Sequence, residues 1–420
     1  MTGAVFVLLL LGGVPIAVVL AMTAIFYIRV SDNTLLYDSF AQQMFSGIES
    51  YGLLAIPLFM LAGELMNDGG LTRRLVNAAR VFVGGFRGGL AYINLLANVF
   101  MAAIIGSAAS QIAVMSRAMV PEMQREGYSR EFAAATTAAG GLLSPIIPPS
   151  MLFVIYGVLA QLPIGDMFLA GIIPGLILSA TFFVIIALIG LKQQFPKGTW
   201  MSGAEAGRAV LAALPAALIP VAIVGGILGG IATPTESAAI ASLIAFVLGG
   251  FLYGELKFRN LGRLFARTAV NASLVVFLVA AANVFGWVII YEAVPQKLAA
   301  MLTTITSDPF LFFLIVNAAL LLIGMVLDGI AALILVVPIL LPIAVNEFGI
   351  DPFQFGVVVC LNLVLGLLTP PVGAGLYIAS AMSGATPTGI FRALTPFLLS
   401  VLAVLVLLSW WPAPTTTLID

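Results

Sequence analysis

The chain has 420 residues, of which 62% are hydrophobic and only 8% are charged, and its formal net charge is -1. Apolar runs of about 20 residues, the length that crosses a hydrocarbon core of roughly 30 Å, recur along the sequence and leave no room for a soluble domain or a basic nucleic-acid-binding surface. Histidine is absent and the single cysteine, Cys360, lies inside an apolar run, which excludes His-based metal sites, Ser-His catalysis and an internal disulfide, and with them conventional enzyme chemistry.

The first apolar stretch begins at Thr2 with neither a basic n-region nor a small-residue cleavage site, so we expect a retained membrane span rather than a signal peptide. The stretch Thr2–Ile28 is either one long tilted helix or two short helices separated at Gly12–Pro15. Two other segments, Leu36–Ser50 and Leu256–Arg267, mix apolar and polar residues at helical spacing and are too polar to span the bilayer. We expect both to be interfacial helices.

Basic residues flank the apolar stretch at residues 89–116 on both sides, which predicts that it enters and leaves the membrane at the same face. We expect a re-entrant helical hairpin there, with its tip at Gly106–Ser110. A helix at about residues 130–160 follows, and it should be broken near Pro148 and Pro149. Proline removes a backbone donor and clashes with the preceding turn, so a pair of prolines ends one half-helix and starts another.

The second half of the sequence predicts the same arrangement: a hairpin at about residues 310–345 with its tip at Leu327–Ile330, then a broken helix at about residues 353–383. We compared the two halves by shifting the sequence along itself by 222 residues. By chance, roughly half a proline on average would fall on another proline at such a shift. Three prolines match: Pro148, Pro149 and Pro174 fall on Pro370, Pro371 and Pro396. We therefore predict two repeats, residues 1–200 and 201–420, which meet at the polar linker Phe195–Gly207.

Charge indicates how the repeats are oriented. Arg117, Arg125 and Arg130 flank the loop after the first hairpin, whereas the matching loop of the second half holds only Glu347 and Asp351. Because Lys and Arg accumulate in cytoplasmic loops, equivalent loops should face opposite sides of the membrane. The predicted fold class is an all-α polytopic membrane protein with two inverted repeats, each containing a re-entrant hairpin and a broken transmembrane helix, an architecture typical of transporters.

A helix interrupted in the membrane leaves free carbonyls at the end of its first half and free N–H groups at the start of its second half. Carbonyl, hydroxyl, amide and carboxylate oxygens suit an alkali cation. The candidate Na+ ligands at the tips and breaks are Ser107, Ser110, Ser144, Pro145, Asp328, Asn362, Gly366 and Thr369. Positive helix N-termini suit a carboxylate. The candidate substrate-cavity residues are Ser150, Pro148, Pro149, Pro370, Pro371 and Gly373.

The polar candidates also have structural interpretations. The serines Ser107, Ser110 and Ser144 could cap or back-bond their own helices, and Thr369, directly before Pro370, is well placed as an N-cap. An ionisable residue inside an apolar run is costly, so Asp328 either belongs to an ion site or caps the second arm of its hairpin.

Two further carboxylates are assigned to structure. Thr233-Pro-Thr-Glu236 has the spacing of a capping box, so we expect Glu236 to cap its helix rather than carry protons. Glu64 lies close to Asn67, Asp68 and Gly69, and we place it at the membrane interface.

Together these features resemble the large membrane subunit (M, or DctM-like) of tripartite ATP-independent periplasmic (TRAP) transporters, over nearly the whole chain. The resemblance is carried by Gly12–Pro15, Ile56–Phe59, Ala62–Leu65, Gly106–Ser110, Ile147–Ser150, Tyr156–Gly157, Thr233–Glu236, Asp328 and Asn362–Gly373. The first tip departs from the family pattern, because Gln111 follows Ser110 where a run richer in Gly, Ser and Ala is expected.

The resemblance implies a multi-pass protein of the bacterial inner membrane that works as an elevator-type carrier of a small organic acid. It also implies Na+ as the coupling ion with no other cofactor, a separate four-helix Q subunit, and a periplasmic substrate-binding protein (P subunit) that delivers the acid. Two alternatives remain: a stand-alone ion-coupled carrier of organic anions, which predicts the same helix breaks, and a membrane scaffold without transport, which gives no reason for them.

Overall fold

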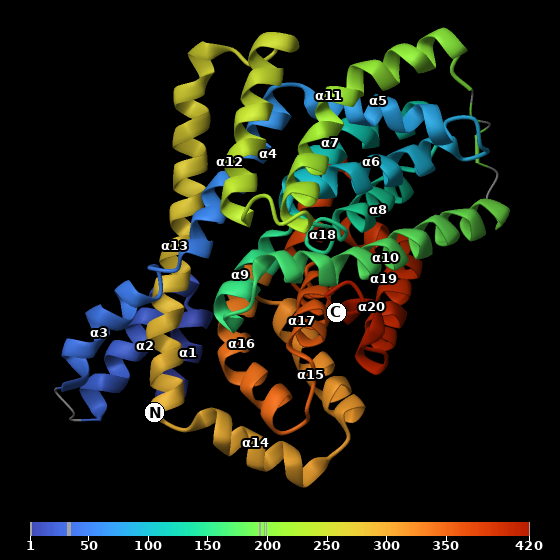
Figure 1. Cartoon of the computed structure of the whole chain (residues 1–420). Helices are drawn as coiled ribbons and strands as arrows, with labels where there is room; N and C mark the ends of the chain where they lie inside the picture. Colours follow the sequence, from blue (N-terminus) through green and yellow to red (C-terminus); the bar gives the residue numbers. More distant parts are fainter. Residues whose placement is uncertain (1, 32–34, 193–194, 197, 199, 420) are drawn as a thin grey trace.

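The computed structural model describes residues 2–31, 35–192, 195–196, 198 and 200–419, and within these ranges all regular secondary structure is helical (Figure 1). Six of the described helices are long and apolar enough to cross a membrane, or up to eight if each of two bent pairs forms one span. The predicted all-α polytopic fold is confirmed. The division of the chain at residue 200 stays a prediction.

The N-terminal stretch forms two helices rather than one. α1 (Thr2–Leu11) and α2 (Ile16–Val30) pack against each other and are separated by Gly12–Pro15, where Gly13 has a φ of 73° and Pro15 precedes the first turn of α2. Glycine adopts this left-handed conformation readily, and proline cannot continue a helix from the preceding turn. α3 (Leu35–Ser46) then forms a separate helix, and the segment Tyr51–Asp68, which contains α4 (Ala55–Asp68), is bent from it by 50°.

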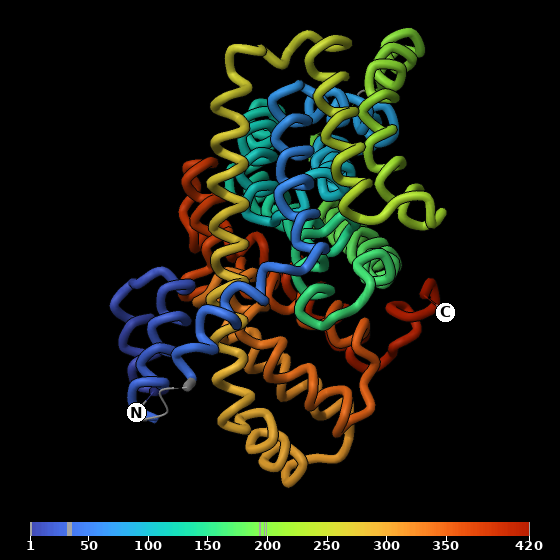
Figure 2. Tube along the Cα trace, turned by 60° about the vertical axis from the view of Figure 1, so that its left-hand side comes forward, coloured from blue at the N-terminus to red at the C-terminus, as the bar shows by residue number. Residues whose placement is uncertain are grey.

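The prediction of an interfacial helix at Leu256–Arg267 is wrong. A short 3-10 turn, Phe258–Asn260, leads into α13 (Leu261–Tyr291), one continuous helix that contains Arg263 and Arg267 in its first turns. The polar residues gave the segment an amphipathic pattern, but no proline interrupts Leu261–Tyr291, so the helix continues into the apolar stretch. Figures 1 and 2 show α13 as a long column at one side of the molecule.

Amphipathic helices instead precede each hairpin. α5 (Leu71–Val83) buries Leu71, Leu75 and Val76 and carries its arginines on the other face, and α14 (Val294–Ile305) buries a similar stripe. Neither α5 nor α14 was predicted from the sequence, because both are short and lie next to more apolar stretches.

The two predicted hairpins are present. The first consists of α6 (Gly89–Ile105) and α7 (Ala108–Arg125), and the second of α15 (Pro309–Gly324) and α16 (Gly329–Asn346). Figure 1 shows α6 and α7 in the upper part of the molecule and α15 and α16 in the lower part. Residues of both tips line one small cavity, so the hairpins approach each other from opposite ends, as inverted repeats require.

Both broken helices are present as well. α8 (Arg130–Gly141) and α9 (Met151–Ala160) form the first, and α17 (Pro352–Gly366) and α18 (Ala374–Ser383) the second. Each break contains a cis proline pair, Pro148-Pro149 and Pro370-Pro371. Ser150 caps α9, and Ser129 caps α8 by accepting a hydrogen bond from the backbone N–H of Phe132.

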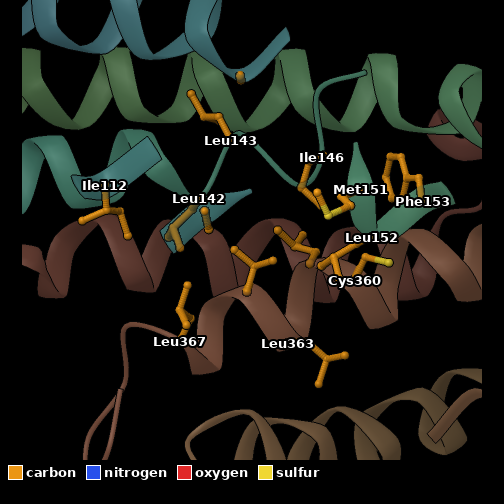
Figure 3. Packing of buried hydrophobic residues seen from close by; sticks show 14 of the residues in the cluster. Ile112, Leu142, Leu143, Ile146, Met151, Leu152, Phe153, Cys360, Leu363 and Leu367 are labelled. Carbon is orange, nitrogen blue, oxygen red and sulfur yellow. The ribbon is translucent and has the colours of Figure 1, made fainter. Parts of the chain in front are cut away.

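The repeats interlock through the second halves of the broken helices. α9 of the first repeat packs against α16 and α17 of the second, and α18 of the second packs against α7 and α8 of the first. Figure 3 shows side chains of this shared core, including Ile112 of α7, Met151 and Leu152 of α9, and Leu363 of α17. Cys360 of α17 is fully buried there, which fits its expected role as a small core residue.

The remaining helices complete the bundle: α10 (Ile164–Lys192), α11 (Gly203–Leu228), α12 (Pro234–Val247) with the π-helical turn Leu248–Leu252, α19 (Pro387–Trp410) and α20 (Ala413–Thr416). Figure 2 shows α12 and α13 on the same side as α4, and α4 packs against both. We call α1 to α4, α12 and α13 the column helices. The predicted capping box is confirmed, because the Thr233 hydroxyl accepts from the Glu236 N–H and the Glu236 carboxylate accepts from the Thr233 N–H.

The linker between the halves is packed rather than free. Phe195 is buried against Tyr128 and Phe132, with ring centroids 5.3 and 5.1 Å away, and the Gly88 N–H donates to the Pro196 carbonyl at 2.9 Å. Burial raises the pKa of the Tyr128 hydroxyl to about 12, so this side chain stays neutral at physiological pH. Lys197 and Thr199 of the predicted linker lie outside the described residues.

Candidate functional site

The tips of the two hairpins meet at a cavity of about 50 Å³. Its lining comes from the first tip, the second tip and both broken helices: Gly106, Ser107, Ala108, Ala109, Pro145, Met151, Leu152, Asp328, Gly329, Ile330, Leu363, Val364 and Leu367. Three of the predicted Na+ ligands, Ser107, Pro145 and Asp328, therefore converge here, although they come from different halves of the chain. A cavity of this size accommodates water or a single ion rather than an organic substrate.

The first tip has an uncapped helix N-terminus. Gly106 takes a φ of 64°, and a Cβ there would lie 3.0 Å from the Pro149 carbonyl oxygen, so glycine is required at this close approach. Ser107 occupies the N-cap position of α7, but its hydroxyl makes no capping hydrogen bond. The first N–H groups of α7 are thus left to interact with whatever occupies the cavity.

The second tip is capped by a carboxylate. Asp328 occupies the N-cap position of α16 and accepts a hydrogen bond from the Ile330 N–H at 3.1 Å, while its side chain remains exposed. The structural interpretation of Asp328 is therefore correct, but the same carboxylate also lines the cavity between the tips. One hydrogen bond uses little of the accepting capacity of a carboxylate, so Asp328 can accept further hydrogen bonds or contact a cation.

Each hairpin tip is tied to the broken helix of its own repeat by an equivalent hydrogen bond. The Met151 N–H donates to the Gly106 carbonyl at 3.3 Å, and the Gly373 N–H donates to the Met325 carbonyl at the same distance. Met151 and Gly373 are matched by the same superposition that pairs the prolines. We call the hairpin tip and the helix break of one repeat a half-site. The two half-sites thus share one backbone arrangement.

A buried amide network holds the first break against the first hairpin. The Gln111 side-chain amide donates to the Asn98 carbonyl and to Asn98 Oδ1, both at 2.9 Å, and to the Gly140 carbonyl at 3.2 Å. Asn98 in turn donates to Asn94 Oδ1 at 2.9 Å, and all four residues are fully buried. Within the described residues, Gln111 Oε1 and the nearby break residue Ser144, through its Oγ, have no hydrogen-bond partner.

The second repeat has a corresponding network. The Asn362 side-chain amide donates to the Asn317 carbonyl and to Asn317 Oδ1, both at 2.9 Å, and Asn317 donates to Ser409 Oγ at 2.9 Å. Asn362 is fully buried, and its Oδ1 has no partner among the described residues. Burying an oxygen without a partner is unfavourable, so these oxygen atoms are where a bound cation would best be accommodated.

Gln111, Asn98 and Asn317 were not predicted from the sequence as site residues. A signal was present, because Asn98 and Asn317 are amides inside the long apolar stretches that lead to the two tips. Gln111 was noted only as a departure from the family pattern, and the structure shows that its amide joins the hairpin to the first break.

Other candidates lie elsewhere or have internal partners. The Thr369 hydroxyl donates to the Leu365 carbonyl at 2.8 Å and Gly373 is the N-cap of α18, so the N-cap interpretation of Thr369 is wrong. The residue is followed by a turn rather than by a helix, because α18 begins only at Ala374. The Ser150 hydroxyl donates to the Pro145 carbonyl at 2.5 Å, which occupies one acceptor site of that carbonyl.

Gly366, which precedes the second break, is paired with Ser144 in the first break when the halves are superposed as for the prolines. A Cβ on Gly366 would lie 2.5 Å from the backbone carbon of Gly324, so close packing of α15 on α17 requires glycine here. The two half-sites therefore differ: the first has a hydroxyl where the second has a backbone contact.

A second cavity of about 180 Å³ separates the first tip from the column helices. Ser107 and Ser110 line it from the tip, and Glu64 and Asn67 of α4 and Asn271 of α13 line it from the column. Glu64 forms an ion pair with Arg267, which also contacts Asp68 at 3.4 Å. The sequence places Glu64 at the membrane interface but gives no indication that α4 and the tip face each other.

A wider cavity, of about 980 Å³, lies between the column helices and α9, α10 and α16. Polar lining residues include Gln43, Gln161, Thr233, Asn283 and Trp287, and none of the described residues that line it is charged. Such a surface hydrates easily but has no cation that would hold an anion tightly. It is therefore suited to passage rather than to tight binding.

The comparisons with known proteins agree with this architecture. The family model described as "Tripartite ATP-independent periplasmic transporter, DctM component" matches residues 3–414. The chain is 36% identical over 404 residues to the sialic acid TRAP transporter large permease protein SiaM of Vibrio cholerae, covering 96% of this chain and 94% of that protein. It is 34% identical over 415 residues to the 2,3-diketo-L-gulonate TRAP transporter large permease protein YiaN of Escherichia coli, covering 97% and 96%.

A longer relative and a solved structure extend the comparison. The isethionate TRAP transporter permease protein DctMQ of Oleidesulfovibrio alaskensis is 37% identical over 415 residues, and the match spans 97% of this chain but only 64% of that protein. The crystal structure of the Alcanivorax borkumensis YdaH transporter matches with a TM-score of 0.66 at 14% identity, covering 90% of this chain and 88% of that one, which supports the fold alone.

The fold, with its paired hairpins and broken helices, defines a multi-pass helical membrane transporter. The chain belongs to the DctM family, the large permease components of TRAP transporters, and is a multi-pass protein of the bacterial inner membrane rather than an enzyme.

Proposed function

We propose that this chain is the translocating subunit of a Na+-coupled uptake system for a small organic acid. The relatives named above carry isethionate, sialic acid or 2,3-diketo-L-gulonate in their names, and all three are organic anions. An uncharged, wide cavity and a cavity of ion size between the two tips are what such a carrier needs: a route for the acid and a binding position for an ion that drives it.

The buried oxygens without partners carry the proposal. Gln111 Oε1 and Ser144 Oγ at the first break, and Asn362 Oδ1 at the second, are hard ligands held in fully buried positions. One Na+ ion at each break would supply the missing partner, with carbonyls at the ends of α8 and α17 completing its coordination. Asp328 would add a negative charge that favours a cation near the second tip.

The acid would bind next to the ions. The N-terminus of α7 has no side-chain cap, and its partial positive charge favours a carboxylate at Ser107. Bound Na+ would add positive charge beside the same position, so ion and acid would bind cooperatively. This explains how a site with few charged residues could select an anion.

Movement would follow an elevator scheme. The hairpins and broken helices interlock into one unit, and the cavities of 980 and 180 Å³ separate that unit from the column helices. A rigid displacement of the unit along the column would expose the tips to each side of the membrane in turn. A small Q subunit and a periplasmic substrate-binding protein would complete the system.

The test is uptake into proteoliposomes that contain this chain, its Q subunit and its binding protein. An inward Na+ gradient should drive accumulation of the acid, and a K+ gradient of equal size should not. Robust uptake by the chain alone would favour a stand-alone carrier, and a failure of the Na+ gradient to drive uptake in the full system would contradict the proposed coupling.

A further inference from the structure

Tyr156 connects the two broken helices across the repeat boundary. It is the largest fully buried side chain in the described chain, and it lies on α9, just after the first break. Its hydroxyl donates to the Pro352 carbonyl at 2.5 Å, in the first turn of α17. The bond is partly buried, because Tyr156 is fully buried and Pro352 half-buried, and a hydrogen bond that is shielded from solvent is electrostatically stronger than one in water.

The first turn of α17 is shaped to receive the tyrosine ring. A Cβ on Gly356 would lie 2.3 Å from Tyr156 Cε1, so the ring occupies the space that any side chain at this position would need. Gly356 lies one turn beyond Pro352, so the ring and the hydroxyl contact the same face of the helix. Asn362 lies further along this helix, which is buried from Gln354 to Gly366, and the second break comes directly after it.

At the opposite crossing, the matching positions make no buried hydroxyl link. Where the halves are superposed, Ile378 of α18 stands in place of Tyr156 and Ala134 of α8 in place of Gly356, and neither side chain has a hydrogen-bonding group. α18 is instead tied to the first repeat near its C-terminal end, where Arg130 donates to the Gly384 carbonyl at 3.3 Å. The two crossings are thus joined differently: by the hydroxyl of the fully buried Tyr156 at one, and by the exposed side chain of Arg130 at the other.

We infer that Tyr156 is a positioning residue that couples the two ion sites. The inference rests on the proposed function, because it concerns how the two proposed Na+ sites communicate. An ion that tightens the first break orders the start of α9, and the Tyr156 link passes that constraint to α17 and Asn362. Binding at one site then lowers the cost of ordering the other, which is positive cooperativity.

The experiment compares Tyr156→Phe with Tyr128→Phe in the complete reconstituted system, by measuring initial uptake against Na+ concentration. Phenylalanine keeps the ring in place and the Pro352 carbonyl keeps its helical partner, so the variant should fold. We expect its half-saturating Na+ concentration to rise roughly three- to ten-fold, the equivalent of one net hydrogen bond, and its Hill coefficient to fall toward one. Tyr128→Phe removes another buried hydroxyl remote from the breaks and should leave both values unchanged.

Gly356→Ala provides an independent variant that leaves the hydroxyl intact but displaces the ring. Gly356→Ala should also lower the Hill coefficient. The control is Gly286→Ala, whose Cβ would be 3.7 Å from Pro338 and which should leave the Hill coefficient unchanged. Wild-type Na+ curves for both Tyr156→Phe and Gly356→Ala would overturn the inference. Uptake that is independent of Na+ in the wild-type system is a different result, because it would refute the proposed coupling itself.

Discussion

Ser107 of the first hairpin tip and Asp328 of the second line the same cavity of about 50 Å³. The serine stands at an uncapped helix N-terminus, and the aspartate caps the opposing helix. A partial positive charge and a full negative charge therefore face each other across a space large enough for one ion or a water molecule. Asp328 thus has two roles that can be tested separately: its side chain caps α16, and its negative charge favours a cation in the cavity.

Asp328→Asn should lower Na+ affinity without loss of the fold. Asparagine caps a helix about as well as aspartate, so the bond from the Ile330 N–H survives, while the charge that favours a cation is removed. We expect half-saturation for Na+ to rise about ten-fold, with a thermal unfolding midpoint near that of the wild type in Na+-free buffer. An unchanged Na+ dependence would restrict Asp328 to capping and leave the second ion site to Asn362 and the carbonyls at the end of α17.

Ser144→Ala should weaken the effect of Na+ without destabilising the protein in its absence. The Ser144 hydroxyl is buried and has no partner among the described residues, so its removal relieves a desolvation cost instead of breaking a hydrogen bond. Ser179→Ala is the matched control, because that buried hydroxyl donates to the Gly175 carbonyl at 2.7 Å. The measurement is the thermal unfolding midpoint of each variant in Na+ and in K+ at equal ionic strength. Stabilisation by Na+ that is as large in Ser144→Ala as in Ser179→Ala would exclude Ser144 as a ligand.

Gly366→Ala should destabilise the second half-site. The new methyl group would lie 2.5 Å from the Gly324 backbone, which cannot withdraw as a flexible side chain could. Overpacking of this kind costs about 1–3 kcal/mol, so the unfolding midpoint should fall and transport should be lost. Gly225→Ala has nothing within 4 Å of its Cβ and should behave like the wild type. A stable and active Gly366→Ala protein would show that α15 and α17 are packed less closely than described.

Cysteines that replace Arg125 and Glu347 should be labelled by impermeant reagents from opposite faces of the membrane. Both residues are exposed and lie at the ends of matching arms, α7 and α16, of the two hairpins. The native Cys360 is fully buried and should not react. Labelling of both positions from one face would contradict the inverted repeats.

The sequence was informative wherever a local physical rule determined the structure. Proline pairs predicted both broken helices, flanking charges predicted the first hairpin, and the Thr233–Glu236 spacing predicted a capping box that is present. These features depend on residues close together in the chain, so no knowledge of tertiary packing was needed.

Features that depend on tertiary packing were not predictable in the same way. The pairing of Gln111 with Asn98, and the Tyr156 link to Pro352, arise only once separate helices are placed together. Leu256–Arg267 has an interfacial pattern when taken alone, yet it leads into the long helix α13 because the apolar stretch after it continues without a break. Thr369 precedes a proline as an N-cap often does, but the N-cap of α18 is Gly373, four residues later, and the helix begins at Ala374.

The most direct test of the account is the driving ion of the complete system. Proteoliposomes with the large and small membrane subunits and the binding protein should be loaded with K+ and diluted into Na+ or K+ buffer at equal ionic strength, with the membrane potential clamped. Accumulation of the acid in Na+ buffer alone, with the Na+ dependence weakened by Ser144→Ala and Asp328→Asn, is the predicted result. Equal accumulation in Na+ and K+ buffer would contradict the assignment of the two helix breaks as Na+ sites.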